Sequence, residues 1–188
     1  MNLNRIVSKI QGLFFKTSSE WKAIKEENVT IQQLFIPYAM LLAAIPAISS
    51  FFGLLIWSGR LRAFFAGRAL FLLIYTYLII LALMFLLGLA INELAPNFGC
   101  KKDKTLAFKL SVYMLTPFCI ASILLILPFY FYWFVLLLSL YGVYLLYLGL
   151  GILLDCPADK KLGFAAVVGL IYFVAINLFY LAFRPGYF

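Results

Sequence analysis

The chain has 188 residues, of which 66% are hydrophobic and 12% are charged, and it carries a formal net charge of +8. Water-soluble domains carry roughly 25% charged residues because water must solvate their surface, so this composition excludes a soluble globule and indicates an integral membrane protein. The lack of histidine and the three scattered cysteines argue against a soluble enzyme, a zinc protein or a secreted mini-protein, and the sequence predicts no catalytic set, cofactor or metal site.

Residues 3–16 are the first predicted element. Apolar side chains recur there at helical spacing, while Arg5, Lys9 and Lys16 lie on the other sides. This pattern is typical of an amphipathic helix that lies in the membrane surface with its apolar face at the acyl boundary. The apolar positions are Leu3, Ile6, Val7, Ile10, Leu13 and Phe14.

A second short helix is predicted to follow. Thr17 and Glu20 fit a capping box, in which each side chain satisfies a backbone N–H of the first turn. Trp21 and Ile24 share one face, so we expect this helix to rest on the cytoplasmic surface with Trp21 at headgroup level. Trp21 is interpreted either as an interfacial anchor or as a docking residue for a partner. The candidate contacts for a partner or for lipid are Trp21, Ile24 and Glu27.

Four stretches without charged side chains are long enough to cross a membrane, which takes about 20 apolar residues. The third, residues 110–154, would be roughly 68 Å long as one helix, so it must fold back on itself. Pro128 is the predicted break, because proline lacks an N–H and disfavours helix in the residue before it. The sequence therefore predicts an all-α bundle of five transmembrane helices, near residues 33–57, 69–92, 110–127, 130–154 and 162–183.

Lysine and arginine are distributed unequally between the two sides of these helices. With a cytoplasmic N-terminus, eleven lie inside and four outside, which the positive-inside rule favours. We therefore predict a cytoplasmic N-terminus and a C-terminus outside. This orientation and attraction to anionic lipid explain the net charge without nucleic-acid binding. Arg60, Arg62 and Arg68 depart from the rule and are interpreted as snorkelling to lipid phosphates, with a functional anion site as the alternative.

Polar side chains run along the third predicted helix. No Lys, Arg, Asp or Glu occurs in the central part of any span, which argues against a proton-coupled pump. Pro117 removes a backbone hydrogen bond and leaves the carbonyl of Tyr113 in need of a partner. These polar side chains either hold neighbouring helices together through hydrogen bonds or line a small polar cavity. We expect this polar stripe to face the bundle interior. The candidate intramembrane polar site is Tyr113, Thr116, Pro117 and Ser122, with Ser111 and Cys119 on the same stripe.

The fourth predicted helix is rich in glycine and tyrosine. Glycines let a neighbouring helix approach closely, so we interpret this pattern as a packing surface, with a ligand-stacking wall as the alternative. The residues concerned are Tyr141, Gly142, Tyr144, Tyr147, Gly149 and Gly151.

Two of the cysteines, Cys100 and Cys156, fall in the two short loops predicted to lie inside. We expect both to be free thiols in a reducing cytoplasm. Two thiols without histidine make a poor metal site.

Short segments with a characteristic order are spread along the chain. They are Glu20-Trp21-x-x-Ile24-x-x-Glu27, Tyr38, Leu42-Ala43-Ala44-Ile45-Pro46-Ala47-Ile48, Phe52-Gly53, Asn97-Phe98-Gly99, Ala107-x-Lys109-Leu110, Tyr113-x-x-Thr116-Pro117, Leu140-Tyr141-x-x-Tyr144-Leu145-Leu146-Tyr147-Leu148-Gly149 and Pro157-x-Asp159-Lys160. In this order they resemble the bacterial Yip-domain membrane proteins over roughly residues 17–161. The chain departs from that family where Thr17 stands in place of a proline and Cys100 in place of a second glycine.

This resemblance implies a five-helix membrane fold with a cytoplasmic N-terminus, in a bacterial inner membrane. The eukaryotic branch of the family binds Rab-type GTPases and works in vesicle traffic between Golgi and endoplasmic reticulum. The bacterial branch has no well-established biochemical activity. With only residues 1–30 before its first span, this chain is poorly equipped to copy GTPase binding.

Two functions remain open at the level of sequence. The leading hypothesis is a non-enzymatic membrane protein of the Yip type, acting through protein and lipid contacts in membrane organisation or a trafficking-like role. The alternative is a small transporter, channel or lipid-moving subunit with a polar cavity near the first and third helices, where Pro37, Pro46 and Pro117 interrupt the spans.

The predicted organisation is a cytoplasmic amphipathic segment, residues 1–30, followed by a five-helix transmembrane domain, residues 31–188. The expected partners are membrane lipids, a second copy of the chain, and a membrane or cytosolic protein. No cofactor and no nucleic acid is expected.

Overall fold

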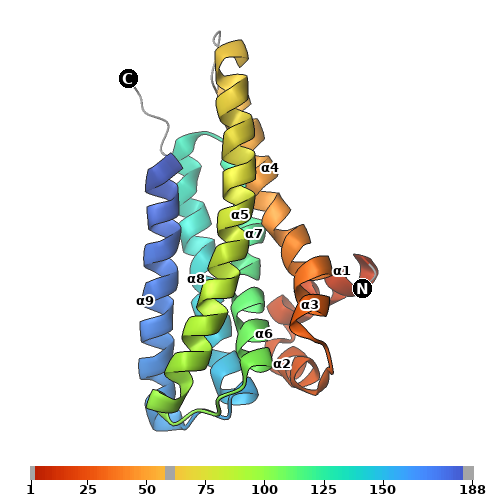
Figure 1. Cartoon of the computed structure of the whole chain (residues 1–188), viewed down its shortest axis with the longest axis vertical. Coiled ribbons are helices and arrows are strands. Elements are labelled where there is room, and N and C mark those ends of the chain that lie inside the picture. The colour runs from red at the N-terminus through yellow and green to blue at the C-terminus, as the bar shows by residue number, and fades with distance from the viewer. Residues whose placement is uncertain (1–2, 58–61, 184–188) are drawn as a thin grey trace.

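The computed structural model describes residues 3–57 and 62–183, with side chains described for 6–57, 67–128 and 130–178. Every regular element in these residues is a helix. Figure 1 shows long helices lying side by side, with the short N-terminal helices beside the lower half of the bundle. The first long helix begins in the lower half of the molecule and the last one ends in its upper half (Figure 1), as an odd number of spans requires.

Within the described residues, five helical segments are long and apolar enough to cross a membrane, which confirms the predicted all-α membrane fold. Several of them are composite. The segments are α3 (Ile31–Leu34) with η1 (Phe35–Ala39) and α4 (Met40–Trp57); α5 (Arg62–Leu94) with η3 (Ala95–Phe98); α6 (Lys104–Met114) with α7 (Thr116–Ala121) and η4 (Ser122–Ile126); η5 (Phe129–Phe131) with α8 (Tyr132–Leu153); and α9 (Ala158–Phe183).

The helices extend further into charged sequence than the charge-free stretches predict. α6 begins at Lys104, six residues before the predicted start, because the Asp103 carboxylate accepts a hydrogen bond from the Leu106 N–H at 3.0 Å. α9 begins at Ala158 instead of residue 162. Charged side chains are compatible with a helical turn that extends beyond the hydrocarbon, so charge marks the membrane boundary and not the helix end.

Prolines divide the third and fourth spans as predicted. Leu127, the residue before Pro128, is extended, with φ −81° and ψ 168°, and it ends η4. This is the fold-back expected from the steric restriction that proline places on its predecessor. A smaller break at Leu115 separates α6 from α7, two residues before Pro117.

The third span occupies the centre of the bundle. In its most apolar stretch 72% of the residues are buried, against 28–44% in the other four spans. Glycines on α8 allow this central helix to approach closely. A Cβ at Gly142 would collide with the Met114 carbonyl oxygen, and a Cβ at Gly149 would meet Leu110 and Trp21 side chains. The predicted packing role of the glycines is therefore confirmed for these two positions.

The chain before the first span forms a helical hairpin, α1 (Leu3–Phe15) and α2 (Thr17–Glu26). The predicted capping box at its turn is wrong. Lys16 is the N-cap residue without a side-chain cap bond, and the Thr17 hydroxyl instead donates to the Leu13 carbonyl at 2.8 Å. A capping box does occur at the start of α3, between Thr30 and Gln33.

The expectation of free thiols at Cys100 and Cys156 is also wrong. The two residues, 56 positions apart, form a disulfide between the loop after η3 and the loop between α8 and α9. The same loops are joined by a backbone hydrogen bond from the Lys101 N–H to the Leu154 carbonyl at 2.8 Å. Sequence could not predict this pairing, because the two loops meet only through the packing of four spans.

Candidate functional site: a polar network beneath the N-terminal hairpin

The structure buries the aromatic and aliphatic residues that the sequence placed at the membrane surface. Trp21 is 0% exposed and Ile24 is 1% exposed. The Trp21 ring meets the Tyr113 ring edge to face, with centroids 6.0 Å apart, and it fits over the slot left by Gly149. The apolar face of α2 therefore packs on the bundle instead of resting in lipid, because a side-chain-free position on α8 makes room for the indole.

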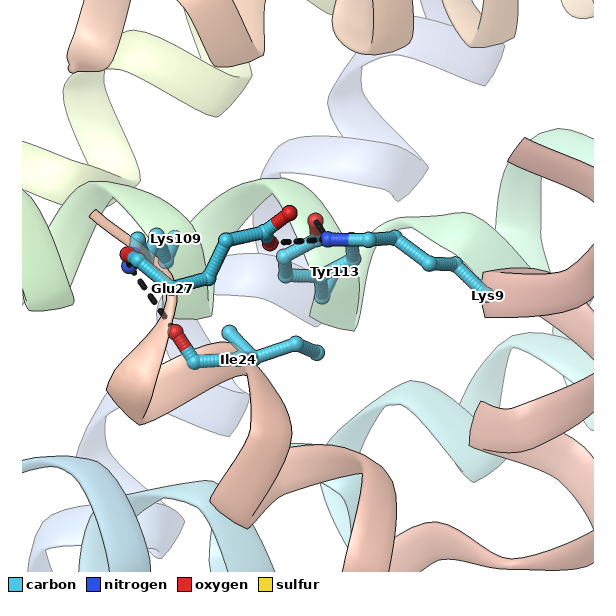
Figure 2. A network of polar contacts seen from close by, with 5 residues as sticks. All are labelled: Lys9, Ile24, Glu27, Lys109 and Tyr113. Carbon is cyan, nitrogen blue, oxygen red and sulfur yellow. Dashed lines mark hydrogen bonds and ion pairs between the residues drawn. The ribbon is translucent and has the colours of Figure 1, made fainter. Parts of the chain in front are cut away.

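The first helix is anchored to the same place by an ion pair. Lys9 reaches from α1 and pairs with the Glu27 carboxylate, just past the end of α2. The Lys9 ammonium also donates to the Tyr113 hydroxyl at 3.1 Å. Figure 2 shows both contacts converging on the Lys9 nitrogen, with Tyr113 on the central helix behind it. Because both charged side chains are largely buried, this pair is screened by water far less than a surface pair.

A second lysine closes the end of α2. The Lys109 ammonium donates to the Ile24 carbonyl at 2.8 Å and to the Glu27 carbonyl at 2.6 Å, and Lys109 is 3% exposed (Figure 2). The last carbonyls of a helix have no partner within it and carry partial negative charge. A cation there both donates the missing hydrogen bonds and interacts favourably with this charge. Lys109 is thus a capping residue supplied to α2 by α6.

Sequence reasoning missed both lysines as site residues. The sequence pattern places Lys9 on the polar side of a surface helix and Lys109 just before the third predicted span. One signal was present, because Lys109 lies four residues before Tyr113 and therefore on the same helix face. Its partners, however, are 85 and 82 residues away, and no pattern in the sequence indicates them.

The network continues inward from Tyr113 to the predicted intramembrane site. The rings of Tyr113 and Tyr38 lie 4.9 Å apart, and the Tyr38 and Thr116 hydroxyls are 3.0 Å apart. Tyr113, Thr116, Pro117 and Ser122 are all buried, so the polar stripe faces the bundle interior, as expected. Tyr113 is the residue at which the two predicted sites meet.

Hydrogen bonding in this stripe is mostly local. Ser111 donates to the Phe108 carbonyl, Thr116 to the Val112 carbonyl and Ser122 to the Cys119 carbonyl. Thr116 also joins the first and third spans through Tyr38. The Tyr113 carbonyl, which loses its helical partner because of Pro117, accepts a hydrogen bond from the Leu115 N–H. The break between α6 and α7 therefore supplies this carbonyl with a partner. These contacts favour the packing interpretation of the stripe.

A pocket of about 430 Å³ opens between the two helices of the hairpin, next to the ion pair. Burial raises the pKa of the Glu20 carboxyl above its usual value, while the nearby Lys9 charge partly opposes this shift. Among the side chains that the structure describes, no group of three or more His, Cys, Asp or Glu is placed to hold a metal ion. The pocket is lined by Ser8, Lys9, Glu20, Ala23, Ile24, Glu26 and Glu27.

Comparison with known proteins relates the whole arrangement to one family. A family profile described as the Yip1 domain matches residues 12–179. The inner membrane protein YohC of Escherichia coli (strain K12) is 28% identical over 171 residues, which cover 85% of this chain and 86% of that protein. The protein of the same name from Escherichia coli O6:H1 gives the same values. No solved structure matches this chain significantly.

The matched region begins in α1 and ends in α9. It therefore includes the end of α1, all of α2 and all five spans, with Glu27, Lys109 and Tyr113 of the polar network, whereas Lys9 lies before it. The resemblance found in short segments of the sequence is confirmed by this match over the greater part of the chain. The chain belongs to the Yip1 domain family and is a multi-pass membrane protein.

Proposed function

We propose that this protein is a non-enzymatic inner-membrane protein that acts through contacts with lipids and other proteins, with the hairpin α1–α2 as its contact element. One observation carries this proposal. The hairpin turns one apolar face to the bundle, against which Phe14 also stacks on Tyr141, and leaves Val7 and Phe15 outside, the latter 85% exposed. Exposed apolar side chains beside a basic residue, here the exposed Lys16, are an arrangement that binds a membrane surface.

The charged residues of the site support a structural role over a chemical one. Lys9 and Glu27 bind each other, and Lys109 binds the terminal carbonyls of α2. Each of these charges is used to hold the hairpin against the central helix. A general acid or base needs a proton-transfer partner in a substrate, whereas these groups are directed at the chain itself.

The proposed orientation has a cytoplasmic N-terminus and an outside C-terminus. It is supported by the excess of lysine and arginine on the side of the hairpin and by the inner-membrane description of the Escherichia coli relative. In this orientation the hairpin, the loop after η3 and the loop between α8 and α9 all face the cytoplasm. The basic side chains there adjoin the anionic inner leaflet.

Photo-crosslinking in native membranes tests the contact element. A photoreactive residue at position 15 should crosslink to phospholipid, because Phe15 projects from the hairpin. The matched control is position 13, where Leu13 is fully buried and should give only crosslinks within the chain. Identical crosslinking patterns at the two positions, without lipid, would refute the proposed role of the outer face.

A further inference from the structure

The disulfide joins two loops at the end of the molecule where the hairpin lies (Figure 1). Cys100 follows η3, at the end of the second span, and Cys156 lies between α8 and α9. The Lys101–Leu154 backbone hydrogen bond runs beside it. The covalent link therefore fixes the connection between the second and third spans to the connection between the fourth and fifth.

These loops face the cytoplasm in the orientation proposed above, and on that proposed orientation the following inference rests. Cytosolic thiols are kept reduced, so a disulfide there is transient and redox-linked instead of permanent. We propose that Cys100 and Cys156 form a reversible thiol–disulfide site, which closes by exchange with a small disulfide of the glutathione class. The closed form fastens the loops, and the open form releases them.

Two lysines lie close to the loop that carries Cys100. Lys101 directly follows Cys100, and the Lys160 ammonium lies 3.9 Å from the position that a Cβ on Gly99 would occupy. Cys100 and Cys156 are 6% and 9% exposed and lie in loops, whereas Cys119 is fully buried among the spans. The third cysteine therefore provides an internal control.

The exchange balances with the small disulfide as the only co-reactant. The Cys100 thiolate attacks one sulfur of the small disulfide and expels the other as a thiolate, leaving a mixed disulfide. The Cys156 thiolate then attacks the Cys100 sulfur and expels the second small thiolate. The two cysteines lose two electrons, the small disulfide gains them, and the two cysteine protons end on the two released thiols.

A partly exposed ion pair connects the loop of Cys156 to the hairpin. Asp155, the neighbour of Cys156, holds the Lys25 ammonium in the last turn of α2 at 2.6 Å. Asp155 has φ +49°, in the left-handed region, where aspartate is more common than most other non-glycine residues. Opening the disulfide removes a constraint on this loop, so it should loosen the Asp155–Lys25 contact and with it the end of α2.

Thiol counting on the purified full-length chain tests the site. The protein in lipid vesicles is equilibrated with glutathione buffers of stepped reduced-to-oxidised ratio, quenched with acid, unfolded and labelled with a maleimide polymer. We expect one labelled thiol at the oxidising end and three at the reducing end, with Cys100 and Cys156 appearing together. The Cys119→Ala variant should give no labelled thiol at the oxidising end and two at the reducing end. Three thiols at every ratio, or one at every ratio, would overturn the proposal.

Hydrogen exchange in α2 tests the connection to the hairpin. Reduction should speed exchange at the last turn of α2 in the unmodified chain, and Cys100→Ser should show the faster rate at every ratio. If the disulfide opens but the hydrogen-exchange rate at the last turn of α2 is the same in every glutathione buffer, this connection is overturned. Because the titration uses purified protein, it tests the exchange independently of orientation, whereas labelling the loops from outside intact cells would refute the orientation alone.

Discussion

At the scale of single residues, Lys109 is the clearest case of a charge that has become part of the interior. The carbonyls at the end of α2 have no partner within the helix, and the Lys109 ammonium donates hydrogen bonds to those of Ile24 and Glu27. We expect Lys109→Met to keep the apolar stem and to lower the free energy of unfolding in detergent by about 1.5 to 3 kcal/mol, the usual contribution of hydrogen bonds to a charged group.

The matched control for this substitution is Lys104→Met, at an exposed position in the first turn of the same helix. It should change the free energy of unfolding by less than about 0.5 kcal/mol. Chemical unfolding of the detergent-solubilised protein measures both. Equal effects of the two substitutions would show that Lys109 does not cap α2.

The Lys9–Glu27 pair predicts a strong coupling between two substitutions. Removing one partner leaves an uncompensated buried charge, so Lys9→Met alone and Glu27→Gln alone should each destabilise by about 3 kcal/mol. The double variant should lose much less than the sum, because neither charge is then left without its partner. Strict additivity of the two effects in this double-mutant cycle would contradict the pairing. Glu26→Gln, at an exposed neighbouring position, is the control and should leave the stability nearly unchanged.

Glu20 predicts a dependence of stability on pH. Burial raises its folded-state pKa above the usual 4.5. The Lys9 charge opposes this rise, and the Glu27 charge adds to it. The folded state therefore binds the proton more tightly than the unfolded chain does. Its contribution to stability is fully present below the unfolded pKa and is lost as the pH rises through the raised folded pKa.

Thermal unfolding measured over about pH 4 to 8 tests this sign. The unmodified chain should lose stability over that rise relative to Glu20→Gln, which stays neutral at every pH. If the two melting curves change in parallel with pH, Glu20 does not have a raised pKa. The Glu20 carboxylate also lies against Gly12 in α1, so this titration reports on the contact between the two hairpin helices.

At the scale of elements, the contact between α8 and the central helix depends on missing side chains. At Gly142 an added Cβ would collide with the Met114 backbone carbonyl, which cannot move without shifting the helix. We expect Gly142→Ala to destabilise by about 1 to 3 kcal/mol, the usual cost of overpacking a core. Differential scanning calorimetry of the detergent-solubilised protein measures this effect.

Gly67→Ala is the matched control, because nothing lies within 4 Å of its added Cβ in α5. Alanine is the better helix former by roughly 1 kcal/mol, so this variant should be as stable as the unmodified chain or slightly more stable. Loss of stability at Gly67 equal to that at Gly142 would show that the cost comes from helix geometry in general and not from close packing.

The elements also show what the sequence could and could not predict. Charge-free stretches and Pro128 predict all five spans, because hydrocarbon excludes charge and proline restricts its predecessor. Helix starts such as Lys104 were missed, since a cap formed by Asp103 extends the helix beyond the apolar stretch. The amphipathic pattern of the hairpin predicted its helices, but an apolar face does not specify whether it meets lipid or protein.

The site follows the same division. The inward direction of the stripe containing Thr116 was predictable, because unsatisfied polar groups are costly in lipid. The burial of Trp21 was not, because it depends on a gap left by Gly149 in a helix more than 120 residues away. The roles of Lys9 and Lys109 and the Cys100–Cys156 bond likewise arise from contacts between distant segments, for which local periodicity carries no information.

At the scale of the whole molecule, the hairpin and the bundle share one hydrophobic core. Ile6, Leu13 and Trp21 belong to the same buried cluster as the central span. The end that carries this hairpin also carries most of the lysines and both bonded cysteines, so the orientation of the molecule decides which compartment reaches them. Orientation therefore decides which leaflet the proposed lipid contacts involve and whether the proposed thiol exchange takes place in the cytoplasm.

Paired reporter fusions at the two ends of the chain measure this orientation most directly. The account predicts that a reporter active only in the cytoplasm works when fused before Met1, and that a reporter active only outside the inner membrane works when fused after Phe188. A fusion after Phe188 that is active only as a cytoplasmic reporter would contradict the account.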